Sequence, residues 1–137
     1  MSSPTNIAQK AILIREDGNI LALRRSNTDP SRPLTWDLPG GEVEFGEDLL
    51  NSIKREIREE VGFNVETLSL LDCLAWVNPR GEYWVAVGYF AKVPSGTKVT
   101  LSFEHSEFEW ISKEEFLTRE STFRIKRFLE KLPPMTT

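Results

Sequence analysis

The stretch Gly41–Phe63, GEVEFGEDLLNSIKREIREEVGF, is the part of the chain whose pattern says most about fold and function. Apolar residues recur in it at intervals of three, four and four positions: Leu50, Ile53, Ile57 and Val61. This spacing places them on one face of a helix, and we therefore predict a helix over residues 47–61. Glu47 and Asp48 suit the positive end of the helix dipole, and Gly62 suits a helix stop.

Three acids of this helix, Glu56, Glu59 and Glu60, occupy positions i, i+3 and i+4 and therefore project close together beside the apolar face. Like charges at this spacing destabilise a helix by about 0.2–0.5 kcal/mol per pair, and partial burial increases the cost. A divalent cation removes the repulsion, and carboxylate oxygens suit Mg²⁺ or Mn²⁺. The alternative is a solvated helix surface whose acids pair with the basic residues between them.

The same stretch fits the pattern Gly-x5-Glu-x7-Arg-Glu-apolar-x-Glu-Glu-x-Gly-apolar without a gap. Its members are Gly41, Glu47, Arg55, Glu56, Ile57, Glu59, Glu60, Gly62 and Phe63. With each fixed residue type at roughly 7% frequency, seven fixed matches arise by chance about once in 10⁸ windows. The stretch resembles the Nudix box, the signature of the Nudix hydrolase family, and the preceding Trp36–Gly40 resembles the usual lead-in of that family.

The order of elements along the chain favours an α+β fold with a mixed sheet. Periodicity and turn residues predict strands over 7–14, 20–25, 36–38, 68–77, 83–93 and 108–111, and two further helices over 113–118 and 122–132. The resemblance implies a Nudix-type α/β/α sandwich with a mixed β-sheet. The length of 137 residues suits one domain, 1–137, with frayed tails at 1–5 and 134–137.

The resemblance also implies a reaction, the hydrolysis of a pyrophosphate bond in a nucleoside diphosphate derivative. It implies Mg²⁺, with Mn²⁺ as a substitute, bound by Glu56, Glu59, Glu60 and the main-chain carbonyl of Gly40. Arg55 would orient a neighbouring glutamate through charge-assisted hydrogen bonds. One glutamate would accept a proton from the attacking water, with Glu59 as the first choice and Glu56 as the alternative.

The small size favours compact MutT-like members and therefore nucleoside triphosphates, canonical or oxidised, over nucleotide sugars and dinucleoside polyphosphates. A different class of protein is the alternative: a catalytically silent Nudix-like module that binds nucleotide or regulates. Such modules usually lose acids of the box, whereas this chain retains every one, so the sequence favours an enzyme.

Five further residues outside the box are candidates for the site. Many Nudix proteins carry an acid in a loop that completes the metal site, and Glu104 fits that place best, with Glu107 as the alternative. His105 is the only histidine, and it is either a second candidate base or a solvated loop residue. Arg25, and less readily Arg24, is a candidate for binding substrate phosphate, or else forms a surface salt bridge.

Composition limits the partners and the compartment. The formal net charge of −4 argues against a reader of polymeric nucleic acid, and no run of eighteen apolar residues indicates a membrane span. The single cysteine, Cys73, excludes an intramolecular disulfide, so we expect a cytoplasmic protein. The sequence leaves two oligomeric states open, a monomer and a homodimer. Strand aromatics are expected either in the core or as a stacking surface for a base: Trp36, Trp76, Tyr83 and Trp84.

Overall fold

A mixed β-sheet lies between helices in the computed structural model, which describes residues 4–134. Its elements are β1 (Thr5–Arg15), β2 (Ile20–Arg25), β3 (Trp36–Asp37), β4 (Gly40–Glu42), α1 (Leu49–Val61), β5 (Ser69–Val77), β6 (Tyr83–Val93), β7 (His105–Ile111), α2 (Lys113–Thr118) and α3 (Phe123–Lys131). The main strand order is β3-β2-β1-β6-β5, with β4 paired to β1 and β7 paired to β2. Strands β1 and β6 run parallel over their whole length, whereas the other pairs are antiparallel.

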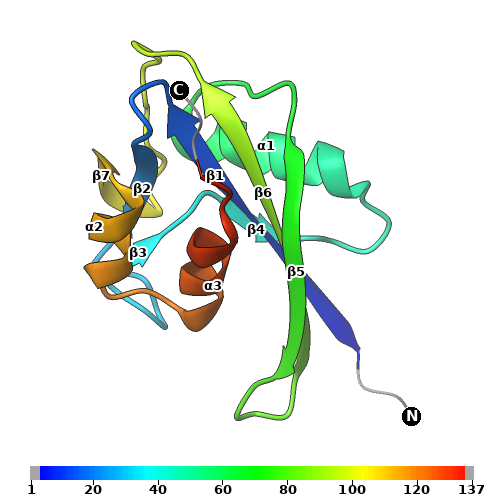
Figure 1. Ribbon diagram of the computed structural model, residues 1–137. Helices are drawn as coiled ribbons and strands as arrows, with labels where there is room; N and C mark the ends of the chain where they lie inside the picture. Colours follow the sequence, from blue (N-terminus) through cyan, green and yellow to red (C-terminus); the bar gives the residue numbers. More distant parts are fainter. Residues whose placement is uncertain (1–3, 135–137) are drawn as a thin grey trace.

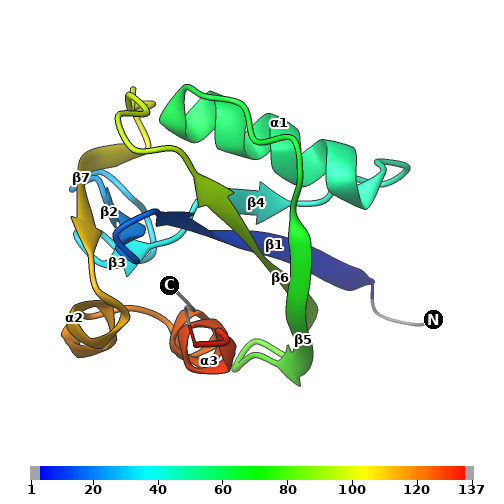
Figure 2. The same ribbon diagram turned by 45° about the horizontal axis from the view of Figure 1, so that its top comes forward.

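The helices cover both faces of the sheet (Figures 1 and 2). Helix α1 lies on one side, and α2 and α3 lie on the other. This is the predicted α/β/α arrangement with a mixed sheet. Among residues 4–134, no helix is both long and apolar enough to cross a bilayer.

Strand β1 joins the helices on the two faces of the sheet, because its side chains point alternately into the core on each face. Ala11 and Leu13 pack with Ile53, Ile57 and Val61 of α1, in a core that also contains Leu21 and Leu23 of β2. On the opposite face, Ile12 and Ile14 pack with residues of α2 and α3, among them Phe116, Ile125, Phe128 and Leu129. The nearly continuous apolar run in the sequence is therefore a strand buried on both sides, as predicted.

The boundaries of helix α1 differ from the prediction at its start. The helix begins at Leu49, and Asp48 is its N-cap, accepting a hydrogen bond from the Asn51 N–H at 3.0 Å. Leu50, predicted on the apolar face, is 47% exposed. The reason lies beneath the first turn, where the buried polar side chain of Gln9 donates to the Leu49 carbonyl at 3.0 Å.

The end of α1 matches the prediction. Gly62 adopts φ +81° and its N–H donates to the Arg58 carbonyl at 3.0 Å. A side chain at Gly62 would also place its Cβ 2.8 Å from that of Thr100. The glycine therefore stops the helix and lets the segment before β7 approach it closely.

Three strand predictions need correction. No strand was predicted between residues 38 and 68, but Gly40–Glu42 form β4 by pairing with β1, a contact between distant parts of the chain. Strand β7 begins at His105, three residues earlier than predicted, because it pairs with β2 up to Arg25. Strand β1 begins at Thr5, within the predicted tail, because Thr5 pairs with Tyr83. Pro134 lies outside regular structure, and residues 1–3 and 135–137 lie outside the described residues.

Candidate functional site

Four carboxylates meet in one small cavity at the C-terminal half of α1. Glu56, Glu59 and Glu60 line this cavity of about 120 Å³ together with Ser102, Phe103 and Glu104. We call it the acid pocket. The helical spacing of the three acids therefore directs them to a common space, as the sequence predicted, and Glu104 joins them from the segment before β7.

Glu60 is the most buried acid of the pocket, with 5% of its surface exposed. Its Oε2 accepts a hydrogen bond from the Gly40 N–H at 2.7 Å. Burial raises the pKa of Glu60 to about 8, and the positive charge of Lys10 opposes this effect only in part. Without an additional cation the carboxyl is therefore largely protonated at neutral pH.

Glu56 lies against the backbone of strand β4. A Cβ atom at Gly41 would come within 2.8 Å of the Glu56 carboxyl carbon, so a side chain at position 41 would displace this carboxyl group. Burial raises the pKa of Glu56, Arg55 lowers it, and the negative charges of Glu59 and Glu104 raise it further. The positive charge of Arg55 therefore offsets only part of the effect of burial and of the neighbouring acids on Glu56.

Arg55 contacts three acids of the box. Its guanidinium lies 3.0 Å from Glu47, 3.3 Å from Glu56 and 3.2 Å from Glu59. Glu47 in turn accepts the Glu44 N–H at 2.7 Å, which ties the loop before α1 to the helix. This geometry suits the positioning role expected of Arg55, since one planar group holds several carboxylates in fixed directions.

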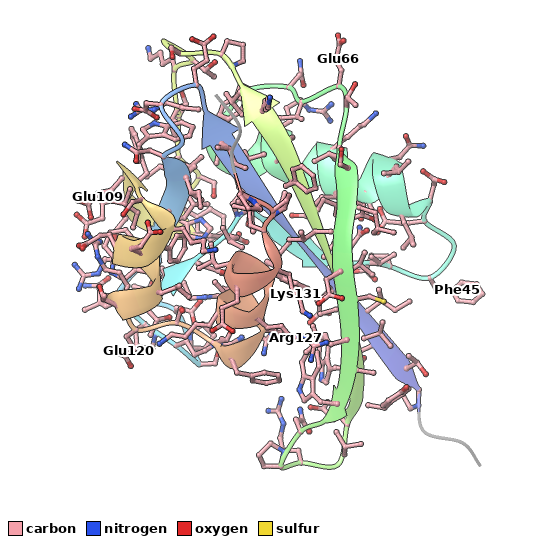
Figure 3. The ribbon with its side chains drawn as sticks, in the orientation of Figure 1. Phe45, Glu66, Glu109, Glu120, Arg127 and Lys131 are labelled. Atoms are coloured by element: carbon pink, nitrogen blue, oxygen red, sulfur yellow. The ribbon has the colours of Figure 1, made fainter. Side chains whose placement is uncertain are left out.

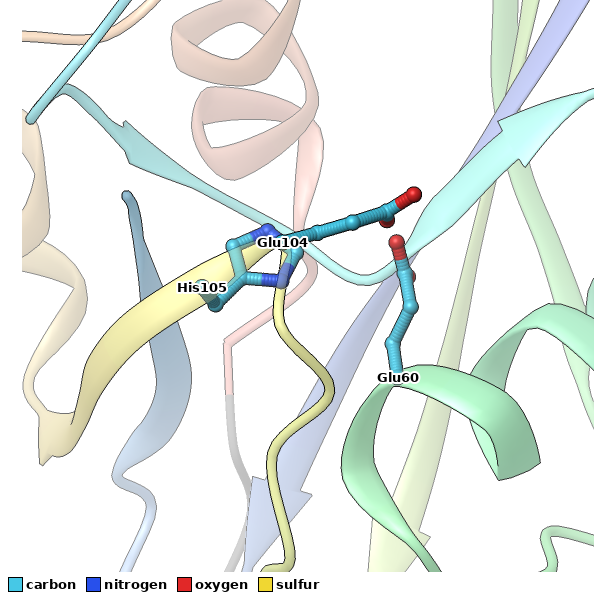
Figure 4. A group of neighbouring side chains, drawn as sticks. All are labelled: Glu60, Glu104 and His105. Atoms are coloured by element: carbon cyan, nitrogen blue, oxygen red, sulfur yellow. The ribbon is translucent and has the colours of Figure 1, made fainter. Parts of the chain in front are cut away.

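The segment before β7 brings Glu104 and His105 to the end of α1. The Ser102 N–H donates to the Glu60 carbonyl at 3.2 Å, and the Ser26 N–H donates to the Glu104 carbonyl at 3.0 Å. Ligand atoms of Glu60, Glu104 and His105 all lie within 4.8 Å of one another, and the carboxylates of the two glutamates approach each other (Figure 4). These three side chains have the spacing of a metal-binding group.

The expectation of a solvated loop histidine is wrong. His105 is 6% exposed and is the first residue of β7. Burial lowers its pKa, and its Nδ1 has no hydrogen-bond partner among the described residues. The residue is buried because β7 extends further along β2 than its apolar pattern indicated.

Glu107, the alternative to Glu104, lies elsewhere. It forms an exposed ion pair with Arg24 at 2.7 Å, between neighbouring strands β7 and β2, and it does not line the acid pocket. Arg25 contacts Asp29 and Asp37, each at 2.7 Å, and lines the larger cleft described next. Both arginines thus form ion pairs, and Arg25 is the one that also faces the cleft.

A cleft of about 1170 Å³ adjoins the acid pocket, because Glu60, Phe103 and Glu104 line both. Trp76 and Trp84 line one part of it and stack with their ring centroids 6.4 Å apart. By contrast, Trp36 is buried in the core and Tyr83 does not line the cleft. The volume is sufficient for a small-molecule ligand, with an acidic region and an aromatic wall.

Several charged residues of this cleft were not predicted from the sequence, among them Lys10, Arg32, Asp37 and Arg124. Lys10 and Asp37 form a buried ion pair of 3.0 Å. A lysine inside the apolar run of residues 7–14 was the one signal for this pair, since a buried charge needs a partner. Arg32 and Arg124 come from a loop and a helix far apart in the chain and carry no local signal.

Comparison with known proteins decides the family. The NUDIX domain model matches residues 4–132. The chain belongs to the Nudix hydrolase family. A MutT-like protein of Streptomyces ambofaciens is 30% identical over 93% of this chain and 77% of its own length. The nucleoside triphosphatase NudI of Salmonella arizonae is 29% identical over 76% of this chain and 80% of its own length.

A solved structure agrees with this result. The MutT protein of Methanosarcina mazei Go1 superposes with a TM-score of 0.81 at 30% identity, covering 95% of this chain and 94% of that one. The resemblance inferred from the Nudix box, the fold and the expectation of a pyrophosphate-hydrolysing enzyme are therefore confirmed.

Proposed function

We propose that this Nudix protein hydrolyses a pyrophosphate bond of a nucleoside triphosphate and requires Mg²⁺, with Mn²⁺ as a substitute. One observation carries the proposal: four carboxylates share a small pocket that adjoins a cleft large enough for a nucleotide. The choice of triphosphates follows the similarity to a nucleoside triphosphatase. The cleft is also lined by Trp84, whose indole ring suits the flat face of a base.

The acid pocket fits a hard divalent cation. Its donors are carboxylate oxygens, and the buried Glu60 is protonated near neutral pH unless a positive charge compensates it. Glu56, Glu59, Glu60, Glu104 and the carbonyl of Gly40 would hold the ion. When bound, the ion supplies charge neutralisation for the phosphate oxygens of the anhydride.

The protein residues have separate tasks in this reaction. Glu59 accepts the proton of the attacking water, because its carboxylate is the most exposed of the three helix acids and water reaches it freely. Glu56 is the alternative base. Arg55 holds both carboxylates in place, and it supports catalysis by fixing their direction rather than by contacting the nucleotide.

His105 has a place beside the acid pocket. Its low exposure and lowered pKa keep the imidazole neutral at physiological pH. A neutral ring nitrogen within 4.8 Å of Glu60 and Glu104 is able to accept a hydrogen bond or bind the ion. Glu107, which is paired with Arg24, takes no part in this proposal.

The proposal is tested by measuring phosphate and pyrophosphate release from a panel of nucleotides. The panel includes canonical and oxidised nucleoside triphosphates, nucleotide sugars and dinucleoside polyphosphates, each with Mg²⁺, with Mn²⁺ and with a chelator. We expect turnover of triphosphates that depends on the metal. Turnover that survives chelation, or no turnover of any compound, refutes it, and nucleotide binding without turnover would support the silent module instead.

A further inference from the structure

The large cleft contains basic residues in addition to its acidic side. Three of its cations form ion pairs within the chain: Lys10 pairs with Asp37 at 3.0 Å, Arg25 pairs with Asp29 and Asp37 at 2.7 Å, and Arg80 pairs with Glu82 at 2.9 Å. Arg32 also lines the cleft, but among residues 4–134 it forms no ion pair and its Nε is buried without a hydrogen-bond partner. This donor points to a missing acceptor, because buried N–H groups are normally satisfied.

Arg124 is the second cation of the cleft for which residues 4–134 provide no ion pair. Its guanidinium lies over the ring of Trp76, 5.0 Å from the centroid, so that the ring supports one face of the planar group. Burial lowers the pKa of Arg124 to about 10, and the positive charge of Arg32 contributes to this decrease. The negative charge of Asp37 opposes this decrease, but no carboxylate among residues 4–134 forms an ion pair with Arg32 or Arg124.

The position of Arg124 in helix α3 strengthens this excess of positive charge. It follows Phe123, the first residue of the helix, and the positive end of a helix dipole disfavours a cation there. Thr122, the N-cap, makes no capping hydrogen bond, and its buried Oγ1 has no partner in the described chain. Positive charge and unsatisfied polar atoms thus coincide on one side of the cleft.

We propose that Arg32 and Arg124 form a phosphate subsite, separate from the acid pocket, for a substrate phosphate outside the attacked anhydride. The inference rests on the proposed function, because it assumes that the anhydride itself binds at the acid pocket of the same cleft. Two cations without an ion pair among residues 4–134 match the charge of a phosphate monoester, which is about −1.5 to −2 at neutral pH. Guanidinium groups also offer paired N–H donors that fit phosphate oxygens.

Two sources can supply this phosphate, namely the terminal phosphate of a triphosphate chain and a phosphate on the sugar. Calorimetric titrations in excess chelator distinguish them without any turnover. One arm compares a nucleoside triphosphate with the diphosphate of the same base. The other compares a nucleoside 3′,5′-bisphosphate with the 5′-monophosphate. We expect an affinity gain of about tenfold, corresponding to about 1.4 kcal/mol, in the arm that carries the relevant phosphate.

Variants show whether the gain comes from the two arginines. Arg124→Gln and Arg32→Gln should abolish it, and Arg124→Lys should retain part of it, because the charge remains while the paired donors are lost. The matched control is Arg127→Gln, which removes an arginine of the same helix (labelled in Figure 3). Arg127 pairs with Asp72 at 3.2 Å and does not line the cleft. Cooperative unfolding of each variant verifies that it is folded.

Some results would overturn the subsite. They are the absence of a gain in both arms, a gain that survives in Arg124→Gln and Arg32→Gln, and an equal loss in Arg127→Gln. The outcome is independent of catalysis: a gain that requires the arginines in a protein without turnover supports the subsite and refutes the proposed function. Metal-dependent turnover without such a gain in affinity supports the proposed function and refutes the subsite.

Discussion

Replacing Glu60 by glutamine should stabilise the protein in the absence of metal, and the stabilisation should grow with pH. Glu60 is buried, and its surroundings raise the pKa of its carboxyl from 4.5 to about 8. A glutamine has nearly the same shape, keeps an oxygen to accept the Gly40 N–H, and carries no charge at any pH. The variant therefore isolates the cost of the buried negative charge.

The sign and size of the effect follow from proton linkage. Between pH 4.5 and 8 the folded protein holds the Glu60 proton while the unfolded chain releases it, so the stability of the wild type falls as pH rises. The difference of about 3.5 pH units, at about 1.4 kcal/mol each, gives on the order of 5 kcal/mol between pH 4.5 and pH 8.5. Below pH 4.5 the carboxyl is neutral in both states, and this cost disappears.

The assay is urea unfolding followed by tryptophan fluorescence at several pH values between 4.5 and 8.5, in excess chelator. Glu60→Gln should exceed the wild type in free energy of unfolding at pH 8.5, and the difference should shrink toward pH 4.5. Glu66→Gln, which removes an exposed acid, is the control and should track the wild type (Figure 3). A difference that does not vary with pH, or a wild type that is the more stable protein at pH 8.5, refutes the reasoning.

Three further predictions concern the reaction. Glu59→Gln should lower kcat by about a hundredfold or more while circular dichroism stays unchanged, and a variant as active as the wild type would remove Glu59 as the base. Gly41→Ala should displace the Glu56 carboxylate, because the added Cβ comes within 2.8 Å of it, and should weaken Mg²⁺ affinity in a calorimetric titration. Unchanged affinity would show that Glu56 does not need its observed position. Excess chelator should abolish phosphate release and added Mg²⁺ should restore it, whereas activity that persists would exclude a required ion.

Local patterns predicted most of the secondary structure. Apolar spacing located α1, and Gly62 marked its end because a glycine at positive φ follows the last helical turn. The strand of residues 83–93 agrees with β6 at both ends, since turn residues flank a β-branched and aromatic run. Such features depend on neighbours in sequence, and a sequence analysis therefore finds them.

The errors concern contacts between distant segments. Strand β4 consists largely of glycine and exists because β1 pairs with it, so no local propensity indicates it. Leu50 fits the apolar spacing but is exposed, because the sheet beneath the first turn presents Gln9. His105 is buried because β7 continues along β2 past its apolar residues.

The candidate site also contains residues that local sequence predicts and residues that only the fold brings together. The three acids of α1 were predicted together because helical spacing alone brings them together, and the structure places Glu104 beside them in the acid pocket. By contrast, Arg32 and Arg124 line the same cleft only when α3 packs on the sheet, and nothing in their local sequence signals this. The sequence thus identifies the acids of the site and Arg25, whereas the places of Arg32 and Arg124 in the cleft emerge only from the fold.

The most direct test of the acid pocket is a calorimetric titration of the metal-free protein with Mg²⁺ at pH 7, repeated in buffers of different ionisation enthalpy. Because Glu60 is largely protonated without metal, binding should release about one proton per protein, and Glu60→Gln should lose this release. Saturable binding with that proton release is the predicted result. The absence of binding, or binding without a released proton, would contradict the claim that these carboxylates hold the ion.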